Sequence, residues 1–117
     1  MRKIEYEKIN FNDTLVSQII YNFLDHTLEI NIESEFEGFD FNYLKISFTD
    51  VKEINSLGFP GLKRNYMEIA HFATHKFEGF INVKITFLVD GGSEMTWVYE
   101  FNCVRIEVFS NEQRFNS

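Results

Sequence analysis

The residues of this chain best suited to chemistry are its three histidines, its single cysteine and the acids beside them. Glu68, His71 and His75 are spaced three and four residues apart, and residues four apart share one face of a helix or of a strand. A catalytic zinc ion needs three protein ligands and an open position, but the HExxH arrangement of zinc proteases is absent. We therefore expect surface or half-buried histidines here, with no metal site and no cofactor.

Two smaller features could also carry chemistry. Asp25 and His26 stand between two strand-like patterns, where Asp commonly bonds its own backbone, so they predict a hairpin turn. Cys103 lies in the most apolar segment, which favours a small buried residue over an activated thiol. We predict no catalytic residue. A small ligand-binding or enzymatic domain remains an alternative, and it requires the three histidines to converge with Asp25 and Glu68.

Negative charge is concentrated in one part of the chain, whose formal net charge is −7 at pH 7. Residues 12–57 hold nine acids and two bases, whereas residues 1–11 carry a net charge of +1 and residues 58–117 a net charge of −1. A one-sided acidic field repels phosphate backbones and anionic lipids and attracts basic partners. We therefore expect a protein partner with a basic surface, no direct contact with nucleic acid and no membrane association.

The acids from Asp25 to Asp40 are interleaved with phenylalanines, and no lysine or arginine lies among them. Aromatic rings beside carboxylates are typical of surfaces that anchor and steer a protein partner. Two interpretations remain open: a solvated strand face with its loop, or a partner-binding surface. The residues that would bind the partner are Asp25, Glu29, Glu33, Glu35, Phe36, Glu37, Phe39 and Asp40.

The elements that must position these residues are mostly strands, because apolar and polar residues alternate with period two over long stretches. The clearest alternation covers residues 27–33, 43–49, 82–90 and 97–108. Between Cys103 and Val104 the phase slips by one, which indicates a β-bulge or a strand buried on both faces. Turns are expected at residues 24–26, 58–61 and 90–93.

Two segments are ambiguous. Residues 62, 66, 69 and 72 share one helical face, whereas the alternation from Ile69 to His75 favours a strand. We favour the strand, and a short helix within residues 62–75 is the alternative. The stretch between Asp50 and Asn55 is either a further strand or a tight turn.

These patterns predict one all-β domain over residues 1–117, built as an antiparallel sandwich or strongly curled sheet of seven to eight strands. Its expected core consists of the apolar residues on one face of each alternating segment. They are Leu28, Ile30, Ile32, Leu44, Ile46, Phe48, Val83, Ile85, Phe87, Trp97, Tyr99, Phe101, Val104 and Ile106.

The lone cysteine and the lack of targeting segments indicate the compartment. Cys103 has no second cysteine to pair with, which fits a reducing environment. The first ten residues are not followed by the apolar run of a secretory signal, and no apolar stretch approaches the length of a membrane helix. We expect a cytoplasmic protein.

Two short motifs lie near the two ends of the strand pattern. Phe11-Asn12-Asp13-Thr14 is similar to F-H-D-[SA], with Asn12 in place of His and Thr14 in place of Ser or Ala. Residues 101–108 read F-x-C-x-x-I-x-V. Together with the apolar strand at residues 44–51, these motifs resemble a group of small immunity proteins from bacterial polymorphic toxin systems. The resemblance implies a non-enzymatic protein that binds and blocks a co-encoded toxin, and many such toxins are basic nucleases.

We predict from these features a non-enzymatic inhibitor, an immunity protein that neutralises a cognate bacterial toxin through an acidic, Phe-containing surface. A phage-encoded inhibitor of a host defence nuclease would use the same acidic surface, and genomic neighbours distinguish the two. The histidine-based domain is the third alternative. None of these features predicts the oligomeric state.

Overall fold

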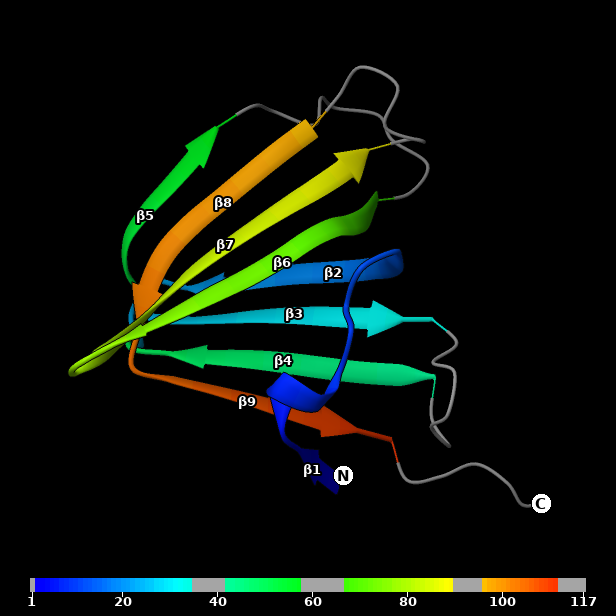
Figure 1. The fold of residues 1–117 in the computed structure, drawn as a ribbon, viewed down its shortest axis with the longest axis horizontal. Helices are drawn as coiled ribbons and strands as arrows, with labels where there is room; N and C mark the ends of the chain where they lie inside the picture. Colours follow the sequence, from blue (N-terminus) through cyan, green and yellow to red (C-terminus); the bar gives the residue numbers. More distant parts are fainter. Residues whose placement is uncertain (1, 35–41, 58–66, 90–95, 112–117) are drawn as a thin grey trace.

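The computed structural model describes residues 2–34, 42–57, 67–89 and 96–111. Within these ranges nine antiparallel strands form one sheet in the order β1-β9-β4-β3-β2-β6-β7-β8-β5 (Figure 1). The strands are β1 (Arg2–Ile4), β2 (Thr14–Asn22), β3 (Thr27–Glu33), β4 (Tyr43–Thr49), β5 (Lys52–Leu57), β6 (Met67–Phe77), β7 (Phe80–Val89), β8 (Thr96–Cys103) and β9 (Arg105–Ser110), with one 3₁₀ turn, Tyr6–Lys8. The all-β antiparallel prediction is confirmed, and the strand count exceeds the predicted seven to eight.

Alternation in β3 and β4 places three apolar residues of each strand on the inner face of the sheet. The register joins them to β9 in rows, so that Leu28, Phe48 and Ile106 lie side by side, and Ile30, Ile46 and Val108 form the next row. All of these side chains are buried. Burying a side chain of this size stabilises the fold by about 1.5–3 kcal/mol.

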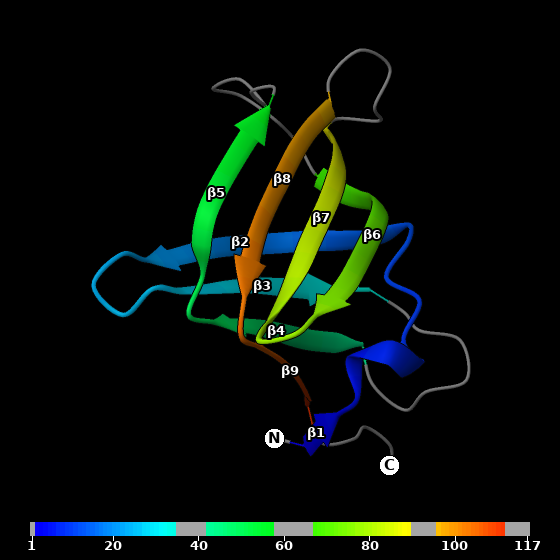
Figure 2. The ribbon, with the colours of Figure 1, turned by 60° about the vertical axis from the view of Figure 1, so that its left-hand side comes forward.

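The sheet folds over itself at two corners. The chain turns from β4 into β5 at Asp50 and Val51, and from β8 into β9 at Val104. Asp50 adopts a left-handed backbone (φ 57°), and the Val104 N–H donates to the carbonyl oxygen of Thr49 at 2.9 Å, which holds the two corners together. As Figure 2 shows, β5 to β8 therefore cross over β2, β3, β4 and β9, as in orthogonally packed sheets.

Aromatic rings fill the space between the two crossed layers. Phe48 of β4 meets Phe101 of β8 edge to face at 5.0 Å between ring centroids. Phe72 of β6 stacks on Phe48 at 6.4 Å and lies 4.8 Å from Phe11, which precedes β2. Phe48 of one layer is thus in contact with rings from two strands of the other layer.

The β8–β9 corner differs from two expectations for residues 97–108. Val104 was expected in the core but is exposed, because it stands at the corner where neither layer covers it. The slip in alternation after Cys103 marks this corner, and it is neither a β-bulge nor a strand buried on both faces. Trp97 and Tyr99 are partly buried against the core, and the other expected core residues are buried.

The ambiguous segments are strands where the structure describes them. β5 occupies 52–57, and β6 covers 67–77, so the alternative of a helix is wrong over 67–75; residues 62–66 lie outside the described residues. A bulge in β6 between Ile69 and His71 shifts the phase. Ile69 is therefore buried while His71 and His75 are exposed, although simple alternation placed all three on one face.

The predicted turn at 24–26 is confirmed as the β2–β3 hairpin. The Asn22 side-chain Oδ1 accepts from the backbone N–H groups of Leu24 and Asp25, and His26 adopts a left-handed backbone. The turns expected at 58–61 and 90–93 lie outside the described residues. No helix in the described part of the chain is long and apolar enough to span a membrane.

We expect Phe48→Ala to lower the free energy of unfolding by about 3–5 kcal/mol, because it leaves a cavity between the two layers. Urea denaturation followed by Trp97 fluorescence measures this change. Phe23→Ala is the matched control, since Phe23 is 70% exposed, and it should cost about 0.5 kcal/mol or less. Equal losses in the two variants would contradict the assigned core.

We also expect the Cys103 thiol to react slowly in the native protein. Burial raises its pKa to about 11, although the N–H of Arg105 donates to the sulfur and opposes this rise. At pH 8 the native thiolate fraction is then about 100-fold lower than for an ordinary thiol. The measurement is the rate of labelling by a disulfide reagent with and without urea, and equal rates would refute the buried thiol.

Candidate functional site on the outer face of β3

The outer face of β3 carries polar residues at every second position. Glu29, Asn31 and Glu33 face away from the core because the residues between them are buried. β3 lies inside the sheet between β2 and β4, and both neighbours pair with it along most of its length. Its backbone is therefore hydrogen-bonded on both sides, which holds these three side chains at fixed spacing.

Asn31 is the centre of a hydrogen-bond network on this face and is only 5% exposed. Its Nδ2 donates to Gln18 Oε1 at 3.1 Å and to Glu29 Oε2 at 3.2 Å. Its Oδ1 accepts from the Tyr43 hydroxyl at 3.0 Å, and its main-chain oxygen accepts from the Ser17 hydroxyl at 3.2 Å. Every polar group of the buried amide is thus partnered, as burial requires.

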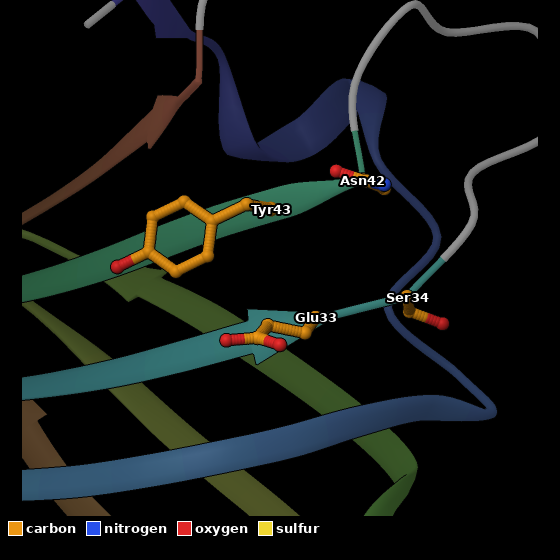
Figure 3. Close-up of a pocket in the computed structure, with 4 residues that line it drawn as sticks. All are labelled: Glu33, Ser34, Asn42 and Tyr43. Carbon is orange, nitrogen blue, oxygen red and sulfur yellow. The ribbon is translucent and has the colours of Figure 1, made fainter.

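A shallow pocket of about 350 Å³ lies at the end of β3 and β4, lined by Glu33, Ser34, Asn42 and Tyr43. Figure 3 shows the side chains of Glu33 and Tyr43 on the same face of the sheet, both extending back along the strands. Ser34 points the other way. The pocket thus offers one carboxylate and one phenol on a common face.

The environment of Tyr43 keeps its phenol protonated. Burial raises its pKa above the ordinary value, and the carboxylates of Glu29 and Glu33 raise it further. The hydroxyl therefore remains a hydrogen-bond donor to Asn31 at neutral pH. This arrangement holds charge and hydrogen-bonding groups in place, and it includes no nucleophile paired with a base.

The acids on this face take no part in the ion pairs of the described residues. Among the described residues, the ion pairs join Lys3 and Arg105 to Glu107, Lys8 to Glu5 and Lys76 to Glu7. None of them uses an acid from residues 12–57. Lys45, the nearest lysine to Glu29 and Glu33 by register, lies over the Phe109 ring at 5.6 Å.

The structure places part of the predicted partner-binding set along one line. Asp25 is exposed in the β2–β3 turn, and Glu29 and Glu33 follow it along β3. The remaining predicted residues, Glu35, Phe36, Glu37, Phe39 and Asp40, lie outside the described residues. The sequence analysis did not identify Asn31 or Tyr43, because their contact depends on the register between β3 and β4.

The histidines are not brought together. His26 lies in the β2–β3 turn, while His71 and His75 lie on β6, and all three are exposed. His75 packs on the Phe77 ring at 4.5 Å. In the part of the chain that the structure describes, no three histidine, cysteine or acidic residues are grouped to hold a metal ion. The alternative of a site built on the histidines therefore has no support here.

The residues of the two short motifs hold the fold together. Phe11 is buried, and the Thr14 hydroxyl donates to its carbonyl oxygen at 2.6 Å. Phe101, Cys103 and Ile106 are core residues on both sides of the β8–β9 corner. The chain matches no protein-family model, and no curated protein sequence matches it. The function must therefore be argued from the site.

We expect Tyr43→Phe to lower the free energy of unfolding at pH 7 by about 1–2 kcal/mol, because it leaves the Asn31 oxygen without its donor. The raised pKa of Tyr43 favours the folded state below pH 10, and this contribution is lost as the pH rises through the native pKa. The difference in the free energy of unfolding between the wild type and Tyr43→Phe should therefore become smaller above pH 10.

Urea denaturation at pH 7, 9 and 11 measures this prediction. Tyr21→Phe is the control, since Tyr21 is exposed on β2 and has no described hydrogen bond. A Tyr43→Phe protein as stable as the wild type at pH 7 would show that the network contributes nothing.

Proposed function

We propose that this protein is a non-enzymatic inhibitor that binds a basic protein through the acidic outer face of β3. The observation that carries the proposal is that Glu29 and Glu33 lie on a central strand paired on both sides, with Asp25 in the turn that precedes it, and that none of the three forms an ion pair with a described residue. Carboxylates held in place this way attract a cationic surface before contact and speed its capture.

Segment 35–41, which lies outside the described residues, belongs to the proposed binding set. It contains three acids and three phenylalanines. The residues flanking it are joined, because the Ser34 N–H donates to the Asn42 carbonyl oxygen at 3.0 Å. Under this proposal its phenylalanines supply the apolar contacts and its acids pair with cations of the partner.

The most suitable partner is a bacterial toxin, with the protein acting as its immunity protein in the cytoplasm. An inhibitor of this kind covers the toxin's cationic site, and many nucleases bind their substrates through such sites. A buried, unpaired Cys103 is compatible with a reducing compartment. A phage-encoded inhibitor of a defence nuclease would use the same surface, so gene neighbourhood decides between the two.

The test begins with affinity capture of the partner from the native host and its identification by mass spectrometry. Association rates are then measured for the wild type and for Glu29→Lys/Glu33→Lys. We expect the double variant to associate at least tenfold more slowly at low salt, because the attractive field is reversed. The difference in association rate between the wild type and the double variant should become much smaller at high salt, since salt screens the electrostatic field.

Glu68→Lys/Glu100→Lys is the matched control. It makes the same change in net charge but places it on β6 and β8, in the other layer. We expect it to change the association rate less than twofold. Equal slowing by both double variants would show that net charge alone acts, and unchanged binding by Glu29→Lys/Glu33→Lys would remove the proposed surface.

A further inference from the structure

Two hairpin turns and both corners meet at one end of the molecule, which we call the corner end. The Val51 N–H donates to the His26 carbonyl oxygen at 2.8 Å, so the β4–β5 corner touches the β2–β3 turn. Figure 1 shows the β6–β7 hairpin at this same end. The β4–β5 corner therefore lies between the β2–β3 turn, which it contacts, and the β6–β7 hairpin, with which it shares a pocket (Figure 2).

Large apolar side chains are exposed at the corner end. Phe23 and Leu24 of the β2–β3 turn are 70% and 84% exposed, and Phe77, Phe80 and Val104 are also exposed. The Phe77 and Phe80 rings stack at 4.8 Å with an angle of 18° between their planes. Exposed apolar residues gathered at one place mark an interaction site, because isolated monomers rarely leave such a surface in water.

A pocket of about 350 Å³, here called the corner pocket, opens within this surface. Its lining comes from both corners and from the β6–β7 hairpin. The lining residues are Asp50, Lys52, Glu53, Gly79, Phe80, Asn102, Cys103 and Val104. Gly79 takes a left-handed backbone (φ 90°), which lets the hairpin turn sharply beside the pocket.

The Glu53 carboxylate is held in place at this pocket. Its Oε1 accepts from Asn102 Nδ2 at 2.9 Å, and Asn102 Oδ1 in turn accepts from Asn82 Nδ2 at 3.0 Å. Among the described residues Glu53 has no ion-pair partner, and the hydrogen bond from Asn102 uses one of its two carboxylate oxygens. An oriented carboxylate beside an aromatic ring matches the guanidinium group, which pairs with the one and stacks on the other.

We propose that the corner end docks a basic protein partner and that the corner pocket receives one of its arginine side chains. The proposal rests on the function proposed above and adds a second contact region to it. The arginine's guanidinium pairs with Glu53, and its aliphatic stem lies against Phe80 and Val104. Phe23 and Leu24, in the turn beyond the β4–β5 corner, make apolar contacts with the partner outside the pocket.

Charge decides between this partner and a second copy of the same chain. The corner end carries Asp25, Asp50, Glu53 and Glu78. Of its three bases, Lys76 is paired with Glu7 at 2.9 Å and Arg105 with Glu107 at 3.6 Å, which leaves Lys52, beside Glu53 in the pocket lining. Two copies joined through this end would bring like charges together, which costs energy, whereas a basic surface is attracted.

The test is an NMR titration of the whole protein with Nα-acetylarginine N-methylamide, alongside the uncharged citrulline analogue of the same shape. We expect saturable shifts of the amides of Gly79, Phe80 and Asn102 with the arginine compound, and shifts at least fivefold smaller with citrulline. Glu53→Gln and Phe80→Ala should each weaken the arginine response at least fivefold. Glu68→Gln, which removes the same charge at the start of β6, outside both proposed contact regions, should leave it unchanged.

Equal responses to arginine and citrulline, or full responses in both pocket variants, would overturn the proposal. A concentration-dependent dimer in sedimentation experiments that Phe80→Ala abolishes would also overturn it, because the corner end would then bind a second copy. Loss of arginine binding in Glu53→Gln and Phe80→Ala, with their amide spectra otherwise native, would support it.

The two proposals can fail separately. Slow partner association in Glu29→Lys/Glu33→Lys with no arginine response in the wild type would overturn the corner pocket alone. A normal arginine response together with unchanged partner association in that double variant would overturn the acidic surface of β3 alone.

Discussion

The structure depends on one constraint: a single sheet must bury its own inner face. No described helix covers it, so the strands on one side have to cross over those on the other. The contact that closes this arrangement is between Phe48 and Phe101, whose rings meet edge to face at 5.0 Å between the layers. The two corners make the crossing possible, and the hydrogen bond from Val104 to Thr49 holds them together.

This closure leaves the other face of the sheet free to carry charge. β3 is paired on both sides, and burial of Leu28, Ile30 and Ile32 fixes which residues point outward. The Asn31 side chain then donates a hydrogen bond to Glu29, and it is itself hydrogen-bonded to Gln18 of β2 and Tyr43 of β4. A surface ordered before binding loses little conformational entropy when a partner arrives, which favours affinity. The proposed partner surface is therefore a consequence of the same packing that forms the core.

Both proposed contact regions combine acids with phenylalanines. The tetrapeptide Phe-Glu-Gly-Phe occurs at residues 36–39 and again at 77–80, and both a duplication and a chance match are compatible with four residues. In the second copy Gly79 makes the turn while the two rings stack beside the corner pocket. The repeat is visible in the sequence. That Phe80 lines a pocket together with Glu53 is not, because the two residues are more than twenty positions apart in the chain.

The sequence by itself determined the all-β class, the inner and outer faces of β3, β4 and β7, and eleven of the nineteen described core residues, because side chains of a strand alternate whatever surrounds it. It also located the acids and the β2–β3 turn. Only the tertiary structure decided that the phase slip after Cys103 is a corner, that Val104 is exposed and that His71 leaves the face of Ile69. It alone buried Asn31 and assembled the corner pocket, since these depend on register and crossing between distant strands, which no local pattern encodes.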